Sequence, residues 1–338
     1  MTGVTVSAVG EKNIIENYLR PLFNPENDIN GVGDDCATIS FPNGSVGLFS
    51  TDRVPADLIS YRAGLLDEFG LGRYLATLNL SDIAACGGVP LALLLNIGVP
   101  ADFLMSSLLA LSKGVASLSS QYSVRVVGGD MSLSSKLSIS ATAIGQVELD
   151  SVLRRGGAQS GDSIFVTREI GLTPVALKYC IGSSLFDTFS PTEIACLRAQ
   201  FTDLLPMITL GRRLVASSFC TSCMDNTDGL WQTLSELSRE SKAAFVVDRN
   251  FVKLPPLVEK YADLAGCDVI QLAFSAGADF SLVGTLRGTW STADACRALD
   301  ANIDIVGRVE SGAGVFMKSN SGVEPLSVPG WNYFVDSH

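Results

Sequence analysis

The stretch of residues 31–52, which reads GVGDDCATISFPNGSVGLFSTD, constrains the fold of this chain more than any other. Its apolar run Val46–Phe49 predicts a short buried strand, after which Ser50–Asp52 would face a cleft. Asp34 and Asp35 come from the turn just before. Carboxylates gathered at one point repel one another unless a cation lies between them, and oxygen ligands beside hydroxyl groups suit Mg²⁺. The structural alternative is turn chemistry plus a helix cap.

Composition sets the broad class of the protein. At 338 residues the chain exceeds what one hydrophobic core usually supports, so we expect two domains. Hydrophobic residues make up 47% and charged residues 17%, which excludes a disordered chain. The formal net charge of −11 disfavours nucleic acid as a partner, because no excess of Lys and Arg is present to neutralise phosphates.

Neither a membrane span nor a signal peptide is expected. The uncharged window Ile83–Ala101 approaches membrane-spanning length, but Gly87, Gly88 and Pro90 interrupt it, which predicts a helix end, a turn and a buried strand. The first residues lack a basic start and an apolar core. Eight cysteines without a framework pattern fit reduced thiols, so we expect a cytoplasmic protein.

Several kinds of catalytic and metal site are not expected. The only histidine is His338, the last residue, which argues against a Ser-His-Asp triad, a Cys-His dyad and a histidine-ligated zinc site. Cys220 and Cys223 form one CxxC pair. Zinc would need a second pair, so small buried residues are the preferred interpretation.

Further aspartates lie at the ends of predicted elements. Asn79 and Asp82 are three residues apart on an otherwise apolar helical segment, so they share a face that would look into a polar site or, alternatively, toward solvent. The segment Val127–Asp130 (VGGD) would end a strand, and its glycines would let backbone N–H groups approach a phosphate; ordinary turn chemistry is the alternative.

The second half of the chain adds two more candidate segments. Residues 154–162 (RRGGAQSGD) form a glycine-rich turn with two arginines, either a phosphate contact or a linker. Residues 223–230 (CMDNTDGL) crowd two aspartates at a helix N-terminus, where Asp228 could be the N-cap. The element pattern predicts an α/β domain over residues 1–150 and an α+β domain over residues 151–338.

The separate motifs fit one kind of chemistry. Six aspartates, each beside Gly, Ser or Thr, occupy the ends of predicted elements: Asp35, Asp52, Asp82, Asp130, Asp225 and Asp228. Such a set, without histidine and without an obvious nucleophile, suits holding several Mg²⁺ ions around a polyphosphate for in-line transfer of the γ-phosphoryl group.

The wording and order of these motifs resemble the thiamine-monophosphate kinase family, within the superfamily of aminoimidazole ribonucleotide synthetase and selenophosphate synthetase. The resemblance rests on GVGDDCA, STD, NLSDIAACGGVP, VGGD, RRGGA, MDNTDGL and SAGAD, and it covers nearly the whole chain. It implies an ATP-dependent kinase with an N-terminal α/β domain that forms a homodimer, ATP near the dimer interface, and a C-terminal α+β domain that closes the cleft.

The resemblance also implies roles for individual residues. Asp52 and Asp130 would serve catalysis, and Gly129, Asp130, Arg155 and Thr227 would contact ATP. The implied magnesium ligands are Asp35, Ser50, Thr51, Asp52, Asp82, Asp130, Asp225 and Asp228. The family usually has serine where Thr227 stands, and the hydroxyl group is retained.

The acceptor side departs from the family pattern. Kinases of this family carry a histidine shortly after the TD motif, and none is available here. Ala278 stands where the family has the glutamate expected to meet the thiamine moiety, and the C-terminal aromatic position falls near Val328, with Trp331 close by. Two alternatives to thiamine-monophosphate phosphorylation therefore stay open: an enzyme of the same fold acting on another phosphate or amide oxygen, and a non-catalytic protein that binds metal or nucleotide.

Overall fold

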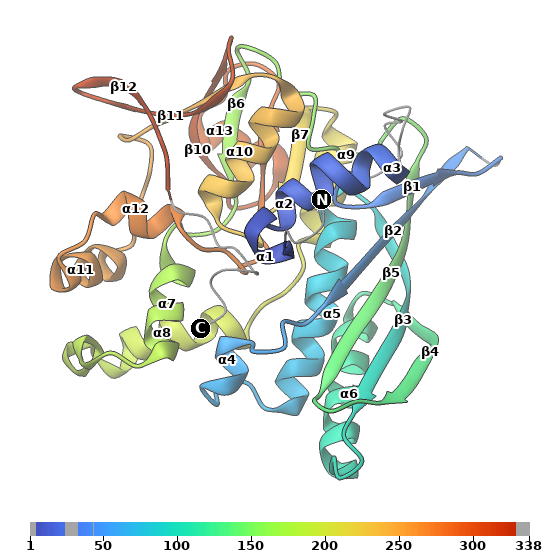
Figure 1. Ribbon diagram of the computed structural model, residues 1–338. Coiled ribbons are helices and arrows are strands. Elements are labelled where there is room, and N and C mark those ends of the chain that lie inside the picture. The colour runs from blue at the N-terminus through green and yellow to red at the C-terminus, as the bar shows by residue number, and fades with distance from the viewer. Residues whose placement is uncertain (1–4, 24–32, 43, 329–338) are drawn as a thin grey trace.

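The computed structural model describes residues 5–23, 33–42 and 44–328, which form two β-sheets with helices between and around them (Figure 1). The strands of the first sheet come from residues 37–148, and those of the second sheet from residues 163–325. Mixed α/β architecture with an N-terminal and a C-terminal sheet is what the sequence predicted.

The first sheet has the strand order β1-β2-β5-β3-β4, and only the β3–β4 pair is parallel. Its strands are β1 (Ala37–Ser40), β2 (Ser45–Arg53), β3 (Val89–Val99), β4 (Arg125–Leu133) and β5 (Ser138–Glu148). Burial alternates along β5, as expected for a strand with one face on a core and the other face open. Helix α5 (Glu68–Ala85) covers the buried face, and α6 (Met105–Gln121) packs on α5.

The second sheet has the order β12-β11-β8-β10-β6-β9-β7, and only β8 and β11 are parallel. Its strands are β6 (Ser163–Val166), β7 (Cys220–Asp225), β8 (Ala244–Asp248), β9 (Leu282–Leu286), β10 (Asp304–Glu310), β11 (Gly314–Ser319) and β12 (Gly322–Pro325). The helices of this half are α7 (Leu172–Ile181), α8 (Pro191–Thr202), α9 (Ile208–Ser217), α10 (Leu230–Ser241), α11 (Pro256–Ala265), α12 (Val269–Phe274) and α13 (Thr292–Leu299), with a 3₁₀ turn at Ser184–Thr188.

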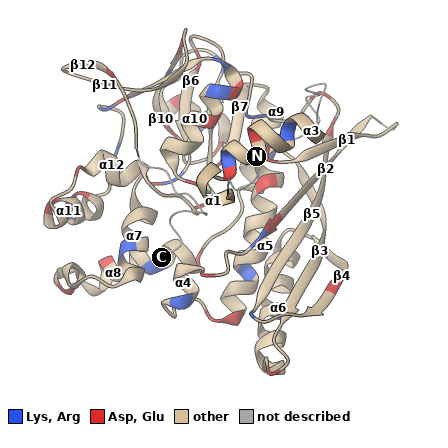
Figure 2. Ribbon diagram, in the orientation of Figure 1, with Lys and Arg blue, Asp and Glu red and all other residues tan. Residues whose placement is uncertain are grey.

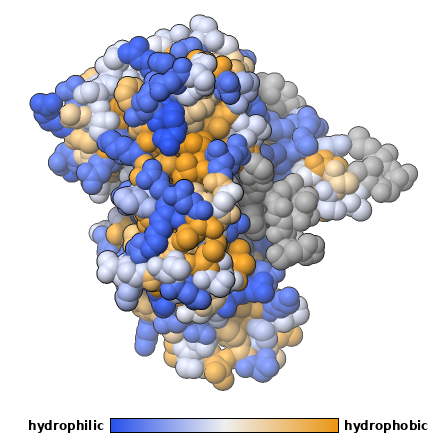
Figure 3. All heavy atoms as spheres, turned by 90° about the vertical axis from the view of Figure 1, so that its left-hand side faces the viewer, coloured by the Kyte–Doolittle hydropathy of each residue, from blue (hydrophilic) through white to orange (hydrophobic). Residues whose placement is uncertain are grey.

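Helices α7, α8, α11 and α12 lie together on one side of the molecule. Viewed from that side, hydrophobic side chains reach the surface in the middle of the face, and hydrophilic ones border them (Figure 3). Beneath this surface an aromatic group joins the helices: Phe186 stacks on Tyr261 of α11 at 5.2 Å between ring centroids and meets Tyr179 of α7 edge-on at 5.3 Å.

Four short helical turns precede the first sheet: α1 (Val6–Val9), α2 (Glu11–Ile14), a π-helical turn (Ile15–Leu19) and α3 (Arg20–Phe23). They run in front of α10 and the end of α5 (Figure 1). A further short helix, α4 (Ile59–Arg62), precedes α5.

Helix α5 is the central element of the core. Leu75, Leu80 and Ile83 are fully buried, because the helix is apolar on nearly its whole circumference and has the first sheet, α6, α9 and β7 around it. A single cluster of buried side chains runs from this helix into the second sheet. Among the described residues, no helix combines the length and apolar character needed to cross a membrane.

Several element boundaries differ from the sequence predictions, chiefly at the functional segments. Strand β2 continues to Arg53, and β4 includes the residues 128–130 that were expected to follow a strand. Both extensions are polar or glycine-rich, so hydrophobic patterning predicts strands that are too short. The extra residues stay extended because β2 pairs with β5 and β4 pairs with β3. The helical segment predicted around Asn79 and Asp82 is α5, and the short helix α4 lies before it.

Candidate active site

Helix α5 positions the first acidic side chains of the site. Asp67 caps its N-terminus by accepting a hydrogen bond from Gly70 N at 2.7 Å. Three turns later, Asn79 Oδ1 accepts from Asp52 N of β2 at 3.0 Å, while Asn79 Nδ2 donates to Leu75 O at 2.9 Å. Asn79 and Asp82 therefore look into a polar site between α5 and β2 and not toward solvent.

Three carboxylates from distant parts of the chain meet beside α5. Oxygens of Asp35, Asp82 and Asp225 lie within 4.8 Å of one another. Ser50 of β2 donates a short hydrogen bond to Asp82, and Ser81 Oγ donates to Asp225 Oδ2 at 2.5 Å. The site thus joins the turn before β1, the C-terminal part of α5 and the end of β7.

Burial and mutual repulsion disfavour the charged form of these carboxyl groups when no cation is bound. Burial, followed by the charges of Asp52, Asp225 and Asp35, holds the pKa of Asp82 well above its usual range. Burial and Asp35 do the same for the pKa of Asp225. Burial also raises the pKa of Asp52, and the hydrogen bond with Asp82 opposes that rise.

Arg155 is the cationic side chain that faces this group of acids. Its Nε donates to Asp35 Oδ1 at 3.0 Å, and its NH2 group donates to the same oxygen at 2.5 Å. Burial opposes the charged guanidinium, but Asp35 and Asp34 together raise its pKa. The other oxygen of Asp35, Oδ2, is buried and has no hydrogen-bond partner in the part of the chain that the structure describes. Among the described residues, Arg155 is set against the buried Asp82 and Asp225 and the half-buried Asp35 and Asp52, which leaves an excess of negative charge, as a cation site requires.

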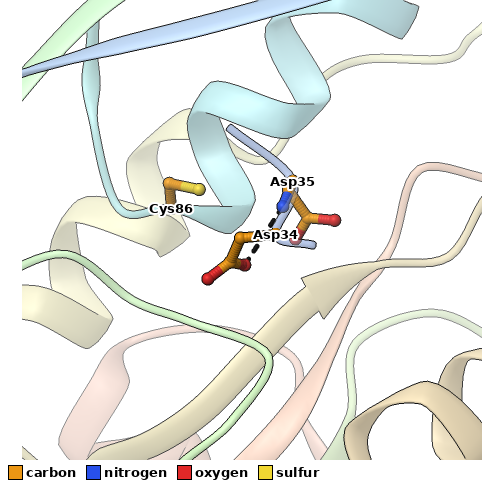
Figure 4. Close-up of side chains that lie close together, drawn as sticks. All are labelled: Asp34, Asp35 and Cys86. Carbon is orange, nitrogen blue, oxygen red and sulfur yellow. Dashed lines mark hydrogen bonds between the residues drawn. The ribbon is translucent and has the colours of Figure 1, made fainter. Parts of the chain in front are cut away.

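Asp34 extends the acidic turn toward the end of α5 (Figure 4). Its Oδ1 accepts a hydrogen bond from Asp35 N at 3.0 Å and another from Arg155 N at 3.2 Å, and its Oδ2 lies 3.5 Å from Arg154 NH1. Burial and the neighbouring Asp35 raise the pKa of Asp34 to about 6. The thiol of Cys86 lies beside both aspartates, although hard cations prefer oxygen ligands.

The loop after β7 supplies the second acidic segment. Gly229, not Asp228, is the N-cap of α10, which corrects the capping alternative for Asp228. Burial raises the pKa of Asp228, while Lys12 and Arg155 lower it. Asn226 fixes this loop, because its Nδ2 donates to both oxygens of the buried Asp279 at 3.2 and 3.1 Å.

The sequence-predicted metal ligands divide between the two faces of the first sheet. Along β2, Ser50 and Asp52 point toward α5, so Thr51 between them points to the opposite face, where Thr142 donates to its hydroxyl at 3.1 Å. Strand register puts Asp130 on this same outer face, in the row of Asn96, Ser140 and Arg53. Three strand spacings, about 14 Å, separate β4 from β2.

The structure therefore brings Asp35, Ser50, Asp52, Asp82 and Asp225 together, with Asp228 near them, and leaves Thr51 and Asp130 on the outer face. The backbone of Gly129 has a φ of +148°, and a Cβ there would lie 1.7 Å from Leu95 O, so only glycine fits this edge strand. Thr227 lies in the loop between Asp225 and α10, where its carbonyl faces Gly277.

Residues near the acceptor side are described in part. Ala278 adopts a left-handed φ of +66°, directly before the buried Asp279. Val328 is buried, whereas Trp331 and His338 lie outside the described residues. Sequence reasoning missed Ser81, Asn226 and Asp279 as parts of the site. Ser81 could have been found from its position next to Asp82, and Asn226 from its position next to Asp225.

Comparison with known proteins adds to this geometry. Residues 33–147 match the family model "AIR synthase related protein, N-terminal domain". A thiamine-monophosphate kinase from Halobacterium salinarum is 30% identical over 257 residues, covering 75% of this chain and 81% of the relative. Another from Pyrococcus horikoshii is 28% identical over 94% of this chain and 96% of the relative.

Solved structures show the same fold over nearly the whole length. A structure described as AaThiL complexed with AMPPCP and TMP superposes with a TM-score of 0.82, covering 98% of this chain and 99% of the other, at 23% identity. The sequence matches extend over most of the chain, and they include the segments that form the acidic site between α5, β2 and β7. The chain belongs to the thiamine-monophosphate kinase family.

Proposed function

We propose that this protein transfers the γ-phosphoryl group of ATP to thiamine monophosphate, giving thiamine diphosphate and ADP. The observation that carries the proposal is the convergence of Asp35, Asp82 and Asp225 in a buried site, in a chain of this family. A relative named thiamine-monophosphate kinase matches 94% of the chain, and a structure of the same fold is of AaThiL complexed with AMPPCP and TMP.

The donor set at this site fits Mg²⁺. Buried carboxylates with neighbouring hydroxyl groups are hard oxygen ligands, and the unpartnered Asp35 Oδ2 is an orphaned acceptor that a cation would satisfy. We propose Asp35, Ser50, Asp52, Asp82 and Asp225 as ligands, with Asp228 holding a further ion. Bound Mg²⁺ would neutralise the polyphosphate and align the γ-phosphoryl group for in-line transfer.

Residues around the acids would bind and orient the nucleotide. Arg155 is held by Asp35 in a buried position, where its guanidinium group is fixed for a phosphate contact. Asn226 and Asp279 hold the loop that presents Thr227. The acceptor, a phosphate monoester, already carries anionic oxygens, so its attack on phosphorus requires no general base and no histidine.

We propose that the protein forms a homodimer and that the outer face of the first sheet lies at the dimer interface. Thr51, Gly129 and Asp130 would then bind ATP and its metal ions near that interface. Strand β4 is an exposed edge strand on which large apolar side chains reach solvent: Val126, Val127, Met131 and Leu133. An unprotected apolar edge of this kind favours pairing with a second chain. Light scattering should report a dimer. The variant Leu133→Glu should weaken the dimer, whereas Leu104→Glu, which changes an exposed residue just before α6, should leave it intact.

Two further assignments accompany the proposal. We place the boundary between the N-terminal and C-terminal domains near residue 150, which is supported by the division of the strands between the two sheets. All eight cysteines are free, which supports a reducing, cytoplasmic location.

The acceptor side favours one second candidate. Ala278 removes a carboxylate that the family uses toward the cationic thiamine moiety, so a different small acceptor could be phosphorylated through the same ATP site. Losing one partner of a buried charge pair costs binding by roughly 2 to 5 kcal/mol. An Ala278→Glu variant tests this: if thiamine monophosphate is the acceptor, the variant should lower its KM.

A steady-state assay decides between the two. ADP release from Mg²⁺-ATP should require thiamine monophosphate, and thiamine diphosphate should accumulate in equal amount. ADP release that ignores thiamine monophosphate but responds to another phosphate or amide would establish the second candidate. Binding of Mg²⁺ and ATP without turnover on any acceptor would indicate a non-catalytic protein.

A further inference from the structure

The N-terminal helical segment, residues 5–23, is held to the protein in an unusual way. None of its helical turns contains a buried residue, and Val6, Leu22 and Phe23 are largely exposed. Burial of apolar surface therefore does little to hold the segment in place. It nevertheless lies against α10, whose N-terminus adjoins the acidic loop of the site (Figure 1).

Ion pairs hold the segment there instead. Lys12 Nζ lies 2.9 Å from Glu236 Oε1, Arg20 NH1 lies 3.2 Å from Glu240 Oε1, and Arg239 NH1 lies 2.8 Å from Glu16 Oε1. All three pairs join the segment to α10, and Figure 2 shows basic and acidic positions close together on the ribbon there. The glutamates of α10 are only 13% and 19% exposed, so these pairs are better shielded from water than ordinary surface pairs.

The same segment reaches the acidic site at two points. The Arg20 guanidinium group lies over Gly33, where an added Cβ would be 3.0 Å from Arg20 Cζ, and Gly33 opens the acidic turn. On its other side, the exposed Glu11 lies within the electrostatic range of Asp228 and Asp52. The segment thus adds another carboxylate to a site that already holds an excess of acids.

We propose that residues 5–23 form a detachable cover over the cation and nucleotide site, anchored on α10 by Lys12, Glu16 and Arg20. The proposal rests on the proposed function, because it takes the acidic site to bind Mg²⁺ and nucleotide. Lys12, Glu16 and Arg20 are positioning residues, because they hold the cover against α10.

Charge explains why the cover would respond to ligand. With the acids uncompensated, Glu11 is repelled by Asp228 and Asp52, so the anchoring pairs work against that repulsion. Divalent cations at the site reverse the sign of the local charge and attract Glu11. Closure should therefore follow loading with the metal–nucleotide complex, and high salt should weaken closure because salt screens partly exposed pairs.

Hydrogen exchange and calorimetry test the proposal without catalysis. The probes are Mg²⁺ and AMPPCP, added to the full chain. In the wild type, both together should slow amide exchange in residues 5–23. The variant Lys12→Glu should lose that protection and bind Mg²⁺-AMPPCP about 3- to 10-fold more weakly, a loss of the size of one or two ion pairs. The swap Lys12→Glu with Glu236→Lys should recover most of both effects.

A matched control separates anchoring from charge change in general. Lys253→Glu breaks another lysine–carboxylate pair, with Asp304 at 2.5 Å, on the surface of the second sheet, and should leave affinity and exchange unchanged. The melting temperature of Lys12→Glu should equal that of the wild type, because the segment adds no core. Glu11→Gln should raise the Mg²⁺ concentration needed for half-maximal AMPPCP binding.

The possible failures are distinct. If the wild type does not bind Mg²⁺-AMPPCP at all, the proposed function is wrong. If it binds tightly, but exchange in residues 5–23 does not change and Lys12→Glu binds equally well, the cover is wrong while the proposed function stands. A Lys12→Glu defect that the charge swap fails to rescue would likewise remove the anchoring role of the Lys12–Glu236 pair.

Discussion

At the scale of single residues, the carboxylates that would bind cations also destabilise the metal-free protein. Asp82 is buried among Asp52, Asp225 and Asp35, and it receives a hydrogen bond from Ser50. Replacing it by asparagine keeps the volume of the side chain and removes one repelled carboxylate. Asp82→Asn should therefore raise the melting temperature of the metal-free protein by a few degrees, on the order of 1 kcal/mol, while lowering kcat at least about 100-fold.

Thermal denaturation with EDTA and a steady-state assay with Mg²⁺-ATP check this prediction. Asp263→Asn, on an exposed position of α11, is the matched control and should change neither quantity. A destabilised Asp82→Asn protein would mean that the carboxylate serves the fold through a favourable contact and not the cation.

Residue spacing in the sequence predicted some of these relationships and missed others. The spacing of Asn79 and Asp82 correctly put both on one helix face toward a polar site, and the structure shows that Asp52 lies there. The sequence did not reveal that Thr51 and Asp130 lie on the other face of the sheet, because side-chain direction follows from strand register, and Ser50–Asp52 were expected to lie beyond the strand end. Ser81 and Asp279 were missed because hydrogen-bond partners come from contacts across the fold.

At the scale of elements, two glycines set how closely α5 and α6 approach. A Cβ at Gly72 would lie 2.0 Å from Leu111 O, and a Cβ at Gly114 would lie 2.0 Å from Phe69 O. Neither glycine has a positive φ, so backbone conformation does not require them; close helix contact does. Gly114→Ala should push α6 away from α5 and destabilise the protein by about 2 to 3 kcal/mol, a typical cost of overpacking.

Denaturant unfolding measures this loss, with Lys113→Ala on the exposed side of α6 expected within about 0.5 kcal/mol of the wild type. Equal stability of Gly114→Ala and the wild type would contradict the close packing. Hydrophobic periodicity does not predict this contact, because periodicity describes one element at a time. Strands β11 and β12 likewise depend on pairing with each other and with β8, which periodicity along one element does not describe.

At the scale of the whole molecule, the site couples folding to pH and to metal. Burial and Asp35 raise the pKa of Asp34 to about 6, and burial also holds the pKa values of Asp82 and Asp225 well above their usual range. The folded protein therefore takes up protons at a higher pH than the unfolded chain does. Stability must then increase as pH falls through about 6, which is opposite in sign to a carboxylate that is stabilised by an ion pair.

The metal-free protein should consequently melt at a higher temperature at pH 5.5 than at pH 7.5. The window is favourable, because the chain contains a single histidine and few other groups titrate there. Mg²⁺ competes with protons for the same oxygens, so the increase in melting temperature caused by Mg²⁺ should be larger at pH 7.5 than at pH 5.5. Calorimetry at both pH values, with EDTA or with excess Mg²⁺, measures all four temperatures. A metal-free protein that loses stability between pH 7.5 and 5.5 would show that the acids are satisfied by protein groups alone, and the cation site would lose its physical basis.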